Sequence, residues 1–132
     1  MHWENSSLGV GTVSLNANAY KYVKRVLDTK RLSYGPFIQR FEREFSRGHD
    51  ARFGIMVNSG TSALQLAVAC LQEAHGWKLG DEVIVPAVTW STTVWPIVQA
   101  GCIPRFVDSD PETLQVRPET IEDAITDRTR AI

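Results

Sequence analysis

Short apolar runs that alternate with helical segments are the feature of this 132-residue sequence that most restricts its fold. Three runs have the length and composition of buried strands, namely 53–57 (FGIMV), 82–85 (EVIV) and 105–108 (RFVD), and the second and third are bounded by Gly or Pro. Helical spacing is found at about 16–30, 37–45 and 61–74 and from Pro118 onward, and residues 89–100 are long enough for another helix. Because apolar strands joined by helical crossovers form parallel sheets covered on both faces, the order predicts a three-layer α/β/α fold with a mostly parallel sheet.

Two segments of the sequence, 61–74 and 129–132, allow more specific predictions. The segment 61–74 is apolar around nearly its whole circumference, so we expect a helix that is buried on most of its surface. The last residues, 129–132, look like the beginning of another strand. A complete domain seldom ends while a core element begins, so we expect a truncated domain; a short edge strand at a natural terminus is the alternative.

Composition and charge exclude several classes of protein. Hydrophobic residues make up 43% and charged residues 22% of the chain, which is typical of a folded globular domain. The 14 Lys and Arg against 15 Asp and Glu argue against non-specific nucleic-acid binding, which needs an excess of cations. No apolar run approaches the roughly 20 residues that span a bilayer, and Met1–Leu15 lacks the pattern of a secretory signal. We therefore expect a cytoplasmic protein that contacts no membrane.

The cysteines and histidines do not suggest a metal site. Cys70 and Cys102 lie among apolar residues without Cys or His at metal spacing, so we expect buried thiols, with a disulfide or a zinc site as the weaker alternative. His2, His49 and His75 have no partner at catalytic or metal spacing and are expected at the surface.

The turn after the first expected strand, NSGTSA, is the best candidate for a ligand site. The first N–H groups of a helix lack internal partners and point along the positive end of its dipole. Gly60 would let an anion approach, and the hydroxyls of Thr61 and Ser62 would add donors, so the turn suits one phosphate group. On this motif alone, a plain helix cap at Asn58 or Ser59 is the simpler interpretation.

A second candidate is Trp90, which follows the strand expected at 82–85. In a parallel sheet it emerges at the same carboxyl edge as the first turn, where open α/β sheets bind ligands, and its indole offers a flat face to an aromatic ring. Taken alone, Trp90 is better explained as a core residue. Trp95 lies about 140° further around a helix, so the two rings cannot serve one site and one of them is expected in the core. Asp108 could reach the same edge, although we favour a turn cap with residues 109–111.

Taken together, these segments resemble the N-terminal third of the DegT/DnrJ/EryC1/StrS family, fold-type I enzymes that use pyridoxal 5′-phosphate (PLP), mostly as nucleotide-sugar aminotransferases. The resemblance begins near Tyr22 and rests on motifs in the right order and spacing, namely RLSYGP (31–36), FEREF (41–45), SGTSAL (59–64), GDEVIVP (80–86), TW (89–90), GCIPRFVD (101–108), IEDAIT (121–126) and RTRAI (128–132). It implies that residues 1–132 are the N-terminal part of the PLP-binding large domain, with a helical segment over 1–48 and βαβ units over 49–132.

The resemblance implies a role for each candidate residue. The Gly60–Ser62 turn would hold the PLP phosphate, and Trp90 would stack on the pyridine ring. Tyr34 would lie near the mouth of the site, close to the sugar nucleotide or the partner subunit. PLP chemistry also needs a Schiff-base lysine and an acid at the pyridine nitrogen, which the family places beyond Ile132. We therefore expect no catalytic residue in this chain, and an inactive chain when it stands alone.

The reaction implied by the resemblance is the transfer of an amino group from an amino acid, with glutamate as the expected donor, to a keto-sugar nucleotide by a homodimer. Within the family the alternative is a sugar 3-dehydratase, in which a histidine replaces the lysine. Two further alternatives are an inactive fragment or pseudoenzyme, and a plain phosphate-binding α/β module.

Overall fold

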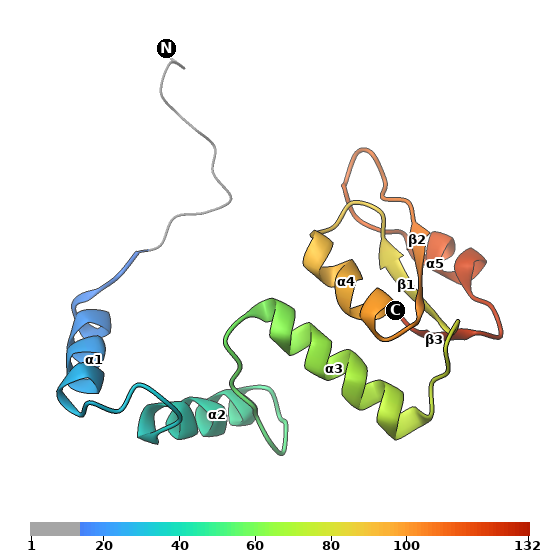
Figure 1. Cartoon of the computed structure of the whole chain (residues 1–132). Coiled ribbons are helices and arrows are strands. Elements are labelled where there is room, and N and C mark those ends of the chain that lie inside the picture. Colours follow the sequence, from blue (N-terminus) through green and yellow to red (C-terminus); the bar gives the residue numbers. More distant parts are fainter. Residues whose placement is uncertain (1–13) are drawn as a thin grey trace, which may run out of the picture. The chain divides into compact units, whose positions relative to one another are not determined.

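The computed structural model describes residues 14–132, which divide into two compact units, one ending at Met56 and one spanning Val57–Ile132 (Figure 1). His2 and nearly all of Met1–Leu15, the segment that lacks the pattern of a secretory signal, lie outside the described residues. The first unit contains two helices, α1 (Ala17–Asp28) and α2 (Pro36–Gly48). The second unit contains, in order, α3 (Gly60–His75), β1 (Glu82–Pro86), α4 (Ser91–Gln99), β2 (Ile103–Val107), α5 (Pro118–Ala124) and β3 (Thr129–Ala131).

In the first unit, α1 and α2 begin where local chemistry favours a helix start. The Asn16 side chain caps α1 by accepting a hydrogen bond from the Ala19 N–H at 3.0 Å. Pro36 occupies the first turn of α2, where a missing N–H costs nothing. The rings of Tyr22 and Phe37 meet edge to face at 5.7 Å and link the two helices. The helices expected at 16–30 and from residue 37 are confirmed.

The second unit is built on a three-stranded parallel sheet of order β2-β1-β3. The central strand β1 pairs with β2 along its whole length and with β3 at its first two residues. The predicted parallel sheet is thereby confirmed, including a strand in the last four residues. Among residues 14–132, no helix is long and apolar enough to cross a membrane.

Both faces of the sheet are covered, as the alternation of side chains along β1 requires. Val83 and Val85 point to the face covered by α4, with α3 packed beside it, and share a core with Trp77, Ile97 and Cys102. On the other face, Ile84 packs against Val107 of β2 and Ala124 of α5. Ile84 and Val85 are each only 2% exposed, and burying such a side chain contributes about 1.5–3 kcal/mol. The layered α/β/α prediction is therefore confirmed in this unit.

The strand predicted at 53–57 is wrong. These residues are irregular and pair with no strand among the described residues, and Phe53 and Ile55 are more than 70% exposed. A β-strand requires a partner strand with which its backbone forms hydrogen bonds, and an apolar sequence pattern alone does not show that such a partner exists. The Met56 N–H instead donates to a carboxylate oxygen of Glu42 at 2.8 Å.

The predicted burial of the third helix is also wrong. No residue of α3 is buried, because within the second unit α3 packs chiefly against α4 and Val68 alone among its residues joins the core. Cys70 on α3 is exposed for the same reason, which corrects the expectation of a buried thiol. Cys102 is buried as expected, and its burial raises the pKa of the thiol. His49 and His75 are exposed, as predicted.

Candidate functional site

The beginning of α3 shows which polar groups of the NSGTSA turn are already used. Ser59 is the N-cap, as the simpler interpretation held, and its hydroxyl oxygen accepts the Ser62 N–H at 3.2 Å. The same hydroxyl donates to the Ser62 hydroxyl oxygen at 3.1 Å, which leaves the proton of the Ser62 hydroxyl available. The Ala63 N–H is bound to the Ser59 carbonyl at 3.0 Å. The cap therefore consumes two amides of the first turn and leaves the rest.

The groups left over are donors that an anion could use. Within residues 14–132, no acceptor is recorded for the N–H groups of Gly60 and Thr61 or for the Thr61 hydroxyl. A β-carbon added at Gly60 would meet no atom within 4 Å, and its φ is not in the left-handed region. Neither packing nor backbone strain explains this glycine, whereas an open, uncapped pair of amides at a helix start fits a phosphate. The residues present therefore fit the phosphate of PLP.

Trp90 occupies the N-cap position of α4 in an extended conformation, and its side chain makes no capping hydrogen bond. The residue is 66% exposed, and Trp95 is 57% exposed. The expectation that one of the two lies in the core is wrong, because α4 buries the side that carries Pro96 and Ile97. Among residues 14–132, the tryptophan that is buried is Trp77, in the connection between α3 and β1. A large exposed indole beside a sheet edge is an available surface for a flat ligand.

The two candidate turns lie at corresponding ends of neighbouring helices. Figure 1 shows α3 and α4 running in the same direction and opposite to β1, so both begin toward the carboxyl end of the sheet. Side-chain amides hold them together, since Gln65 donates to Gln99 at 2.7 Å and Gln72 donates to the Ala100 carbonyl at 2.9 Å. Among the described residues, no hydrogen bond or ring contact joins Trp90 to the Gly60 turn. A pocket shared by the turn and the indole stays a prediction.

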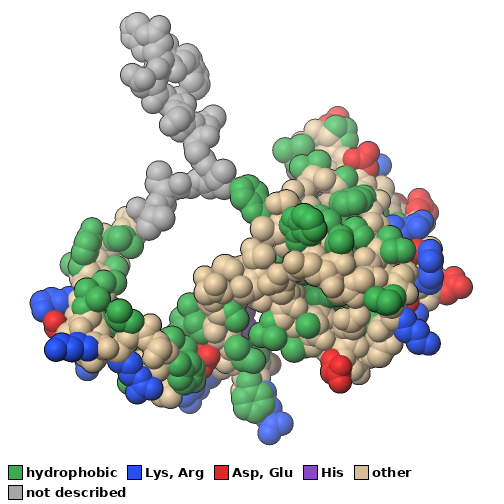
Figure 2. All heavy atoms as spheres, viewed as in Figure 1, with side chains coloured by type: hydrophobic (Ala, Val, Ile, Leu, Met, Phe, Trp, Pro, Cys, Tyr) green, Lys and Arg blue, Asp and Glu red, His purple; other side chains and the backbone are tan. Residues whose placement is uncertain are grey.

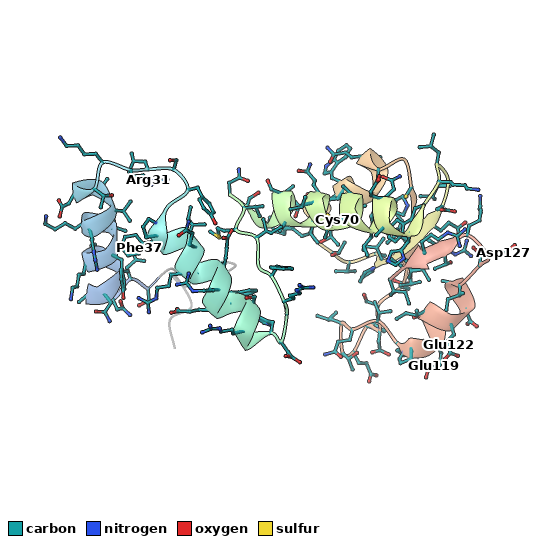
Figure 3. All side chains as sticks on the ribbon, turned by 90° about the horizontal axis from the view of Figure 1, so that it is seen from below. Arg31, Phe37, Cys70, Glu119, Glu122 and Asp127 are labelled. Atoms are coloured by element: carbon teal, nitrogen blue, oxygen red, sulfur yellow. The ribbon has the colours of Figure 1, made fainter. Side chains whose placement is uncertain are left out.

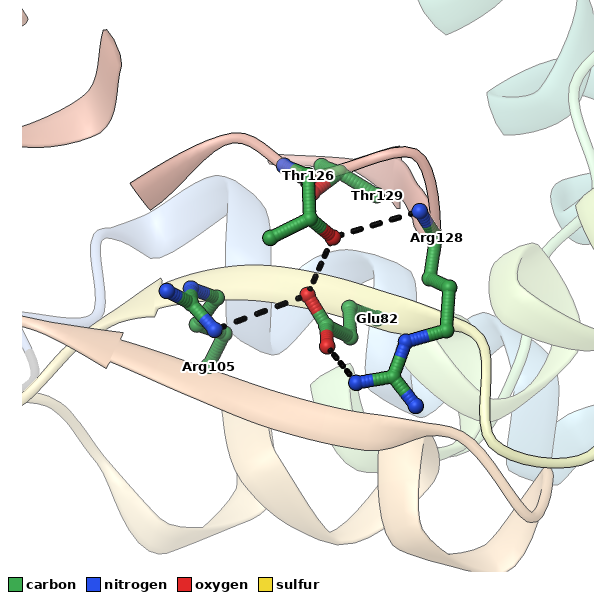
Figure 4. A network of polar contacts seen from close by, with 5 residues as sticks. All are labelled: Glu82, Arg105, Thr126, Arg128 and Thr129. Carbon is green, nitrogen blue, oxygen red and sulfur yellow. Dashed lines mark hydrogen bonds and ion pairs between the residues drawn. The ribbon is translucent and has the colours of Figure 1, made fainter. Parts of the chain in front are cut away.

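At the opposite end of the sheet, a buried carboxylate gathers a polar network that sequence reasoning missed (Figure 4). Glu82 opens β1, and its side chain is only 3% exposed. It accepts a hydrogen bond from the Thr126 hydroxyl at 2.8 Å and forms ion pairs with Arg128 and, at 3.8 Å, with Arg105. The Thr126 hydrogen bond, followed by the charges of Arg128 and Arg105, holds the pKa of Glu82 below its ordinary value.

The neighbouring acid is satisfied in the same way. Asp81 is buried, forms an ion pair with Arg130 at 3.0 Å and accepts the Lys78 N–H at 2.8 Å, and the Arg130 hydrogen bond lowers its pKa most. The sequence contains a sign of this network, because acidic residues lie at the start of β1 and arginines lie in or just before β2 and β3. This network joins the strands to one another and leaves no carboxylate free for chemistry.

The remaining candidate residues have local roles. In the first unit, the Tyr34 hydroxyl donates to Glu42 at 2.9 Å, and this hydrogen bond raises the pKa of the phenol. Tyr34 is half-exposed, and its place near a substrate stays a prediction. In the second unit, Asp108 accepts the Ser109 N–H at 3.1 Å, and Asp110 accepts two further turn amides, which confirms the favoured interpretation of a turn.

Comparison with known proteins decides the family. The model of the DegT/DnrJ/EryC1/StrS aminotransferase family matches residues 13–132. The chain belongs to this family. Its relatives include the GDP-4-keto-6-deoxy-D-mannose 3-dehydratase of Escherichia coli O55:H7, which is 40% identical over 86% of this chain and 30% of the relative. Another is the GDP-perosamine synthase of Escherichia coli O157:H7, which is 41% identical over 90% of the chain and 32% of the relative.

Solved structures agree with this assignment. An E. coli GDP-4-keto-6-deoxy-D-mannose-3-dehydratase with bound hydrated PLP superposes with a TM-score of 0.84 at 37% identity, over 93% of this chain and 32% of that one. The N-terminal part of a fold-type I enzyme, expected from the resemblance, is thereby confirmed as the fold. This DegT/DnrJ/EryC1/StrS chain spans about a third of the length of the curated relatives it matches.

Proposed function

We propose that the protein containing this chain is a PLP-dependent enzyme that transfers an amino group from an amino acid, expected to be glutamate, to a keto-sugar nucleotide. It would do so as a cytoplasmic homodimer. The chain would supply part of the cofactor site and none of the residues that exchange protons with the substrate. This assignment rests on the family match together with one structural observation, the unpartnered amides at the beginning of α3.

Each candidate residue has a physical task in this proposal. The N–H groups of Gly60 and Thr61 and the hydroxyls of Thr61 and Ser62 would bind the phosphate, where the positive end of the α3 dipole favours a dianion. The exposed indole of Trp90 would cover one face of the pyridine ring. When bound, the cofactor supplies the electron sink for amino-group chemistry. The residues of this chain would fix its position and exclude water from one side.

A sugar 3-dehydratase is the second candidate, and the relatives favour it as much as the first. The relatives include a GDP-4-keto-6-deoxy-D-mannose 3-dehydratase at 40% identity and a GDP-perosamine synthase at 41%, so the difference in identity decides nothing. The two reactions differ in what happens to nitrogen. A transaminase replaces the ketone oxygen of the sugar by the amino group of the donor amino acid, and the donor is released as a 2-oxo acid. The product of a dehydratase retains no nitrogen from the donor.

The experiment uses the full-length protein, PLP, a GDP-linked 4-keto-6-deoxy sugar and glutamate labelled at its nitrogen. Mass spectrometry of the sugar product distinguishes the candidates. Labelled nitrogen in the sugar supports the transaminase, and a product that has lost oxygen without gaining label supports the dehydratase. A full-length protein that shows no absorbance band of bound PLP contradicts both and favours the inactive fragment or the phosphate-binding module.

A further inference from the structure

The helix that begins with the proposed phosphate turn, α3, has few apolar contacts with the rest of its unit. Val68 is the one residue of α3 that packs against the buried core, and Leu64, Leu66 and Leu71 remain exposed. Figure 2 shows hydrophobic side chains at the surface of this unit. Apolar packing is non-directional, so contacts of this kind hold a helix against its neighbour without fixing its position along the axis. The axial position of α3 relative to α4 therefore depends on directional contacts.

Two glutamine side chains of α3 supply such contacts. Gln65 donates to the side-chain oxygen of Gln99 at 2.7 Å, and Gln72 donates to the carbonyl oxygen of Ala100 at 2.9 Å. The two donors are seven residues apart, which is about 10 Å along one face of a helix. Their partners are adjacent residues at the end of α4. The glutamines therefore converge on the end of α4, and a shift of α3 along its axis in either direction would lengthen one of the two hydrogen bonds.

The two hydrogen bonds differ in their surroundings. Ala100 is the C-cap of α4, where carbonyl groups lack a partner within the helix, and Gln72 satisfies this carbonyl in a half-buried place. The bond between Gln65 and Gln99 lies at the surface. A change at Gln65 therefore removes the contact without leaving a buried polar group unsatisfied.

The register of α3 against α4 sets the spacing of the two candidate binding groups. Gly60 is the first residue of α3, and Trp90 is the N-cap of α4, so each moves with its own helix. A ligand that contacts both groups needs their spacing to be held within about 0.5 Å. Inorganic phosphate is small enough to contact the turn alone, so its affinity should not depend on this spacing.

We propose that Gln65 and Gln72 are positioning residues for the cofactor. By fixing the register of α3 and α4, they hold the open amides of the Gly60 turn at the distance from Trp90 that PLP requires. Both side chains are engaged with α4, so they act through the two helices and not by contact with PLP. The inference rests on the proposed function, because it takes PLP to contact both the turn and the indole.

The test compares PLP with inorganic phosphate on the full-length apoprotein, by absorbance for PLP and by isothermal titration calorimetry for phosphate. Gln65→Leu and Gln72→Leu remove the amide donor and keep a side chain of similar size. Each should weaken PLP affinity roughly two- to tenfold, since one hydrogen bond is lost, and the double variant should weaken it further. Phosphate affinity should change less than about twofold. The visible circular dichroism of bound PLP should also decrease, because it depends on a fixed orientation of the ring.

Gln65→Glu is the conservative variant that should restore binding. The Gln99 amide can turn and donate to the new carboxylate, so PLP affinity should stay within about twofold of the wild type. The matched control is Gln115→Leu, the same substitution at an exposed residue between β2 and α5. No hydrogen bond of its side chain is recorded within residues 14–132, and both affinities should be unchanged.

Three results would overturn the positioning role. The first is equal PLP affinity in the wild type and both leucine variants. The second is a parallel loss of PLP and phosphate affinity, which would show damage to the turn itself. The third is a loss in Gln65→Glu as large as in Gln65→Leu. If Gln72→Leu does not fold, the exposed position at Gln65 decides alone.

The wild-type protein separates this inference from the proposed function. A wild type that binds PLP, with leucine variants that bind it equally well, keeps the proposed function and loses the positioning role. A wild type without the absorbance band of bound PLP loses the proposed function, and the positioning role with it.

Discussion

The two ends of the parallel sheet differ in how their polar groups are satisfied. At the amino end, Asp81 and Glu82 are buried, and each is held by arginine and by hydrogen bonds from the chain itself. At the carboxyl end, where α3 and α4 begin, the amides of Gly60 and Thr61 have no recorded partner, and the indole of Trp90 is two-thirds exposed. At the amino end the protein itself satisfies the buried polar groups. The carboxyl end presents unbound hydrogen-bond donors and an exposed apolar surface that a ligand could contact.

This difference teaches which residues determine the fold and which are available for binding. Buried carboxylates must be paired, or their desolvation would destabilise the unit, so the residues that pair them are structural. Exposed amides at a helix start cost the fold little and can be exchanged for a ligand. Changes at the amino end should therefore alter stability and leave binding alone, and changes at the carboxyl end should do the reverse.

Gly60→Asp should produce the largest effect on binding. A carboxylate would occupy the space next to the open amides, and its repulsion of the PLP phosphate should weaken cofactor affinity in the full-length protein by roughly a hundredfold. Stability should stay equal or rise by about 0.3–1 kcal/mol, because an acid in the first turn of a helix interacts favourably with the dipole. Titration of the apoprotein with PLP, followed by absorbance, measures the affinity, and thermal unfolding measures the stability.

The matched control for this variant is Ala17→Asp. Ala17 is exposed and is the first residue of α1, as Gly60 is of α3, so the same charge enters at the same helical position. Its effect on stability should be similar, and PLP affinity should be unchanged. Equal PLP affinity in Gly60→Asp and the wild type would contradict the phosphate site.

The sequence predicted the parallel sheet and the helix starts because their causes are local or follow from order along the chain. Strand–helix alternation requires crossovers of the kind observed, and Pro118 begins α5 at a position where a proline is favourable. The Ser59 cap was likewise visible as a residue type before a helix. The prediction that the Gly60 turn binds an anion rests on the same rule, applied to the N–H groups that the cap does not use.

What the sequence could not predict depends on neighbours in space. The apolar run at 53–57 is indistinguishable from a buried strand until a partner strand is looked for, and none exists among the described residues. The exposure of α3 and Trp90 depends likewise on which elements cover them. The Glu82 network joins residues more than twenty positions apart, so no local pattern marks it, although an acid in an apolar strand was a signal that a buried cation should exist.

Glu82→Gln tests the amino end and should give the second-largest effect. Its folded pKa is lowered, so the ionised carboxylate stabilises the unit above the ordinary carboxyl pKa of about 4.3, and this stabilisation is lost as the pH falls below that value. The variant should unfold at a lower temperature at neutral pH. The difference from the wild type should shrink as the solution is acidified through about pH 4 toward pH 2. Thermal unfolding across this pH range measures both.

The matched control is Glu122→Gln, which removes the same charge from an exposed position on α5, with no ion pair recorded within residues 14–132 (Figure 3). Its unfolding temperature should stay near that of the wild type at every pH. PLP affinity of the folded Glu82→Gln protein should also be unchanged, since the carboxylate lies at the far end of the sheet. A loss of PLP affinity without a loss of stability would contradict the division between the two ends.

Trp90→Ala should produce the smallest of these effects and tests the carboxyl end most finely. An aromatic contact contributes about 0.5–1.5 kcal/mol beyond its buried area, so PLP affinity should fall roughly two- to tenfold, and Trp90→Phe should restore most of it. Trp95→Ala is the control, because Trp95 is exposed to a similar degree and lies within α4, five residues after Trp90 at its N-cap. The same PLP titration measures all three variants. Equal losses in Trp90→Ala and Trp95→Ala would show that the indole of Trp90 covers no cofactor, and would leave the Gly60 turn as the only part of the carboxyl end that binds it.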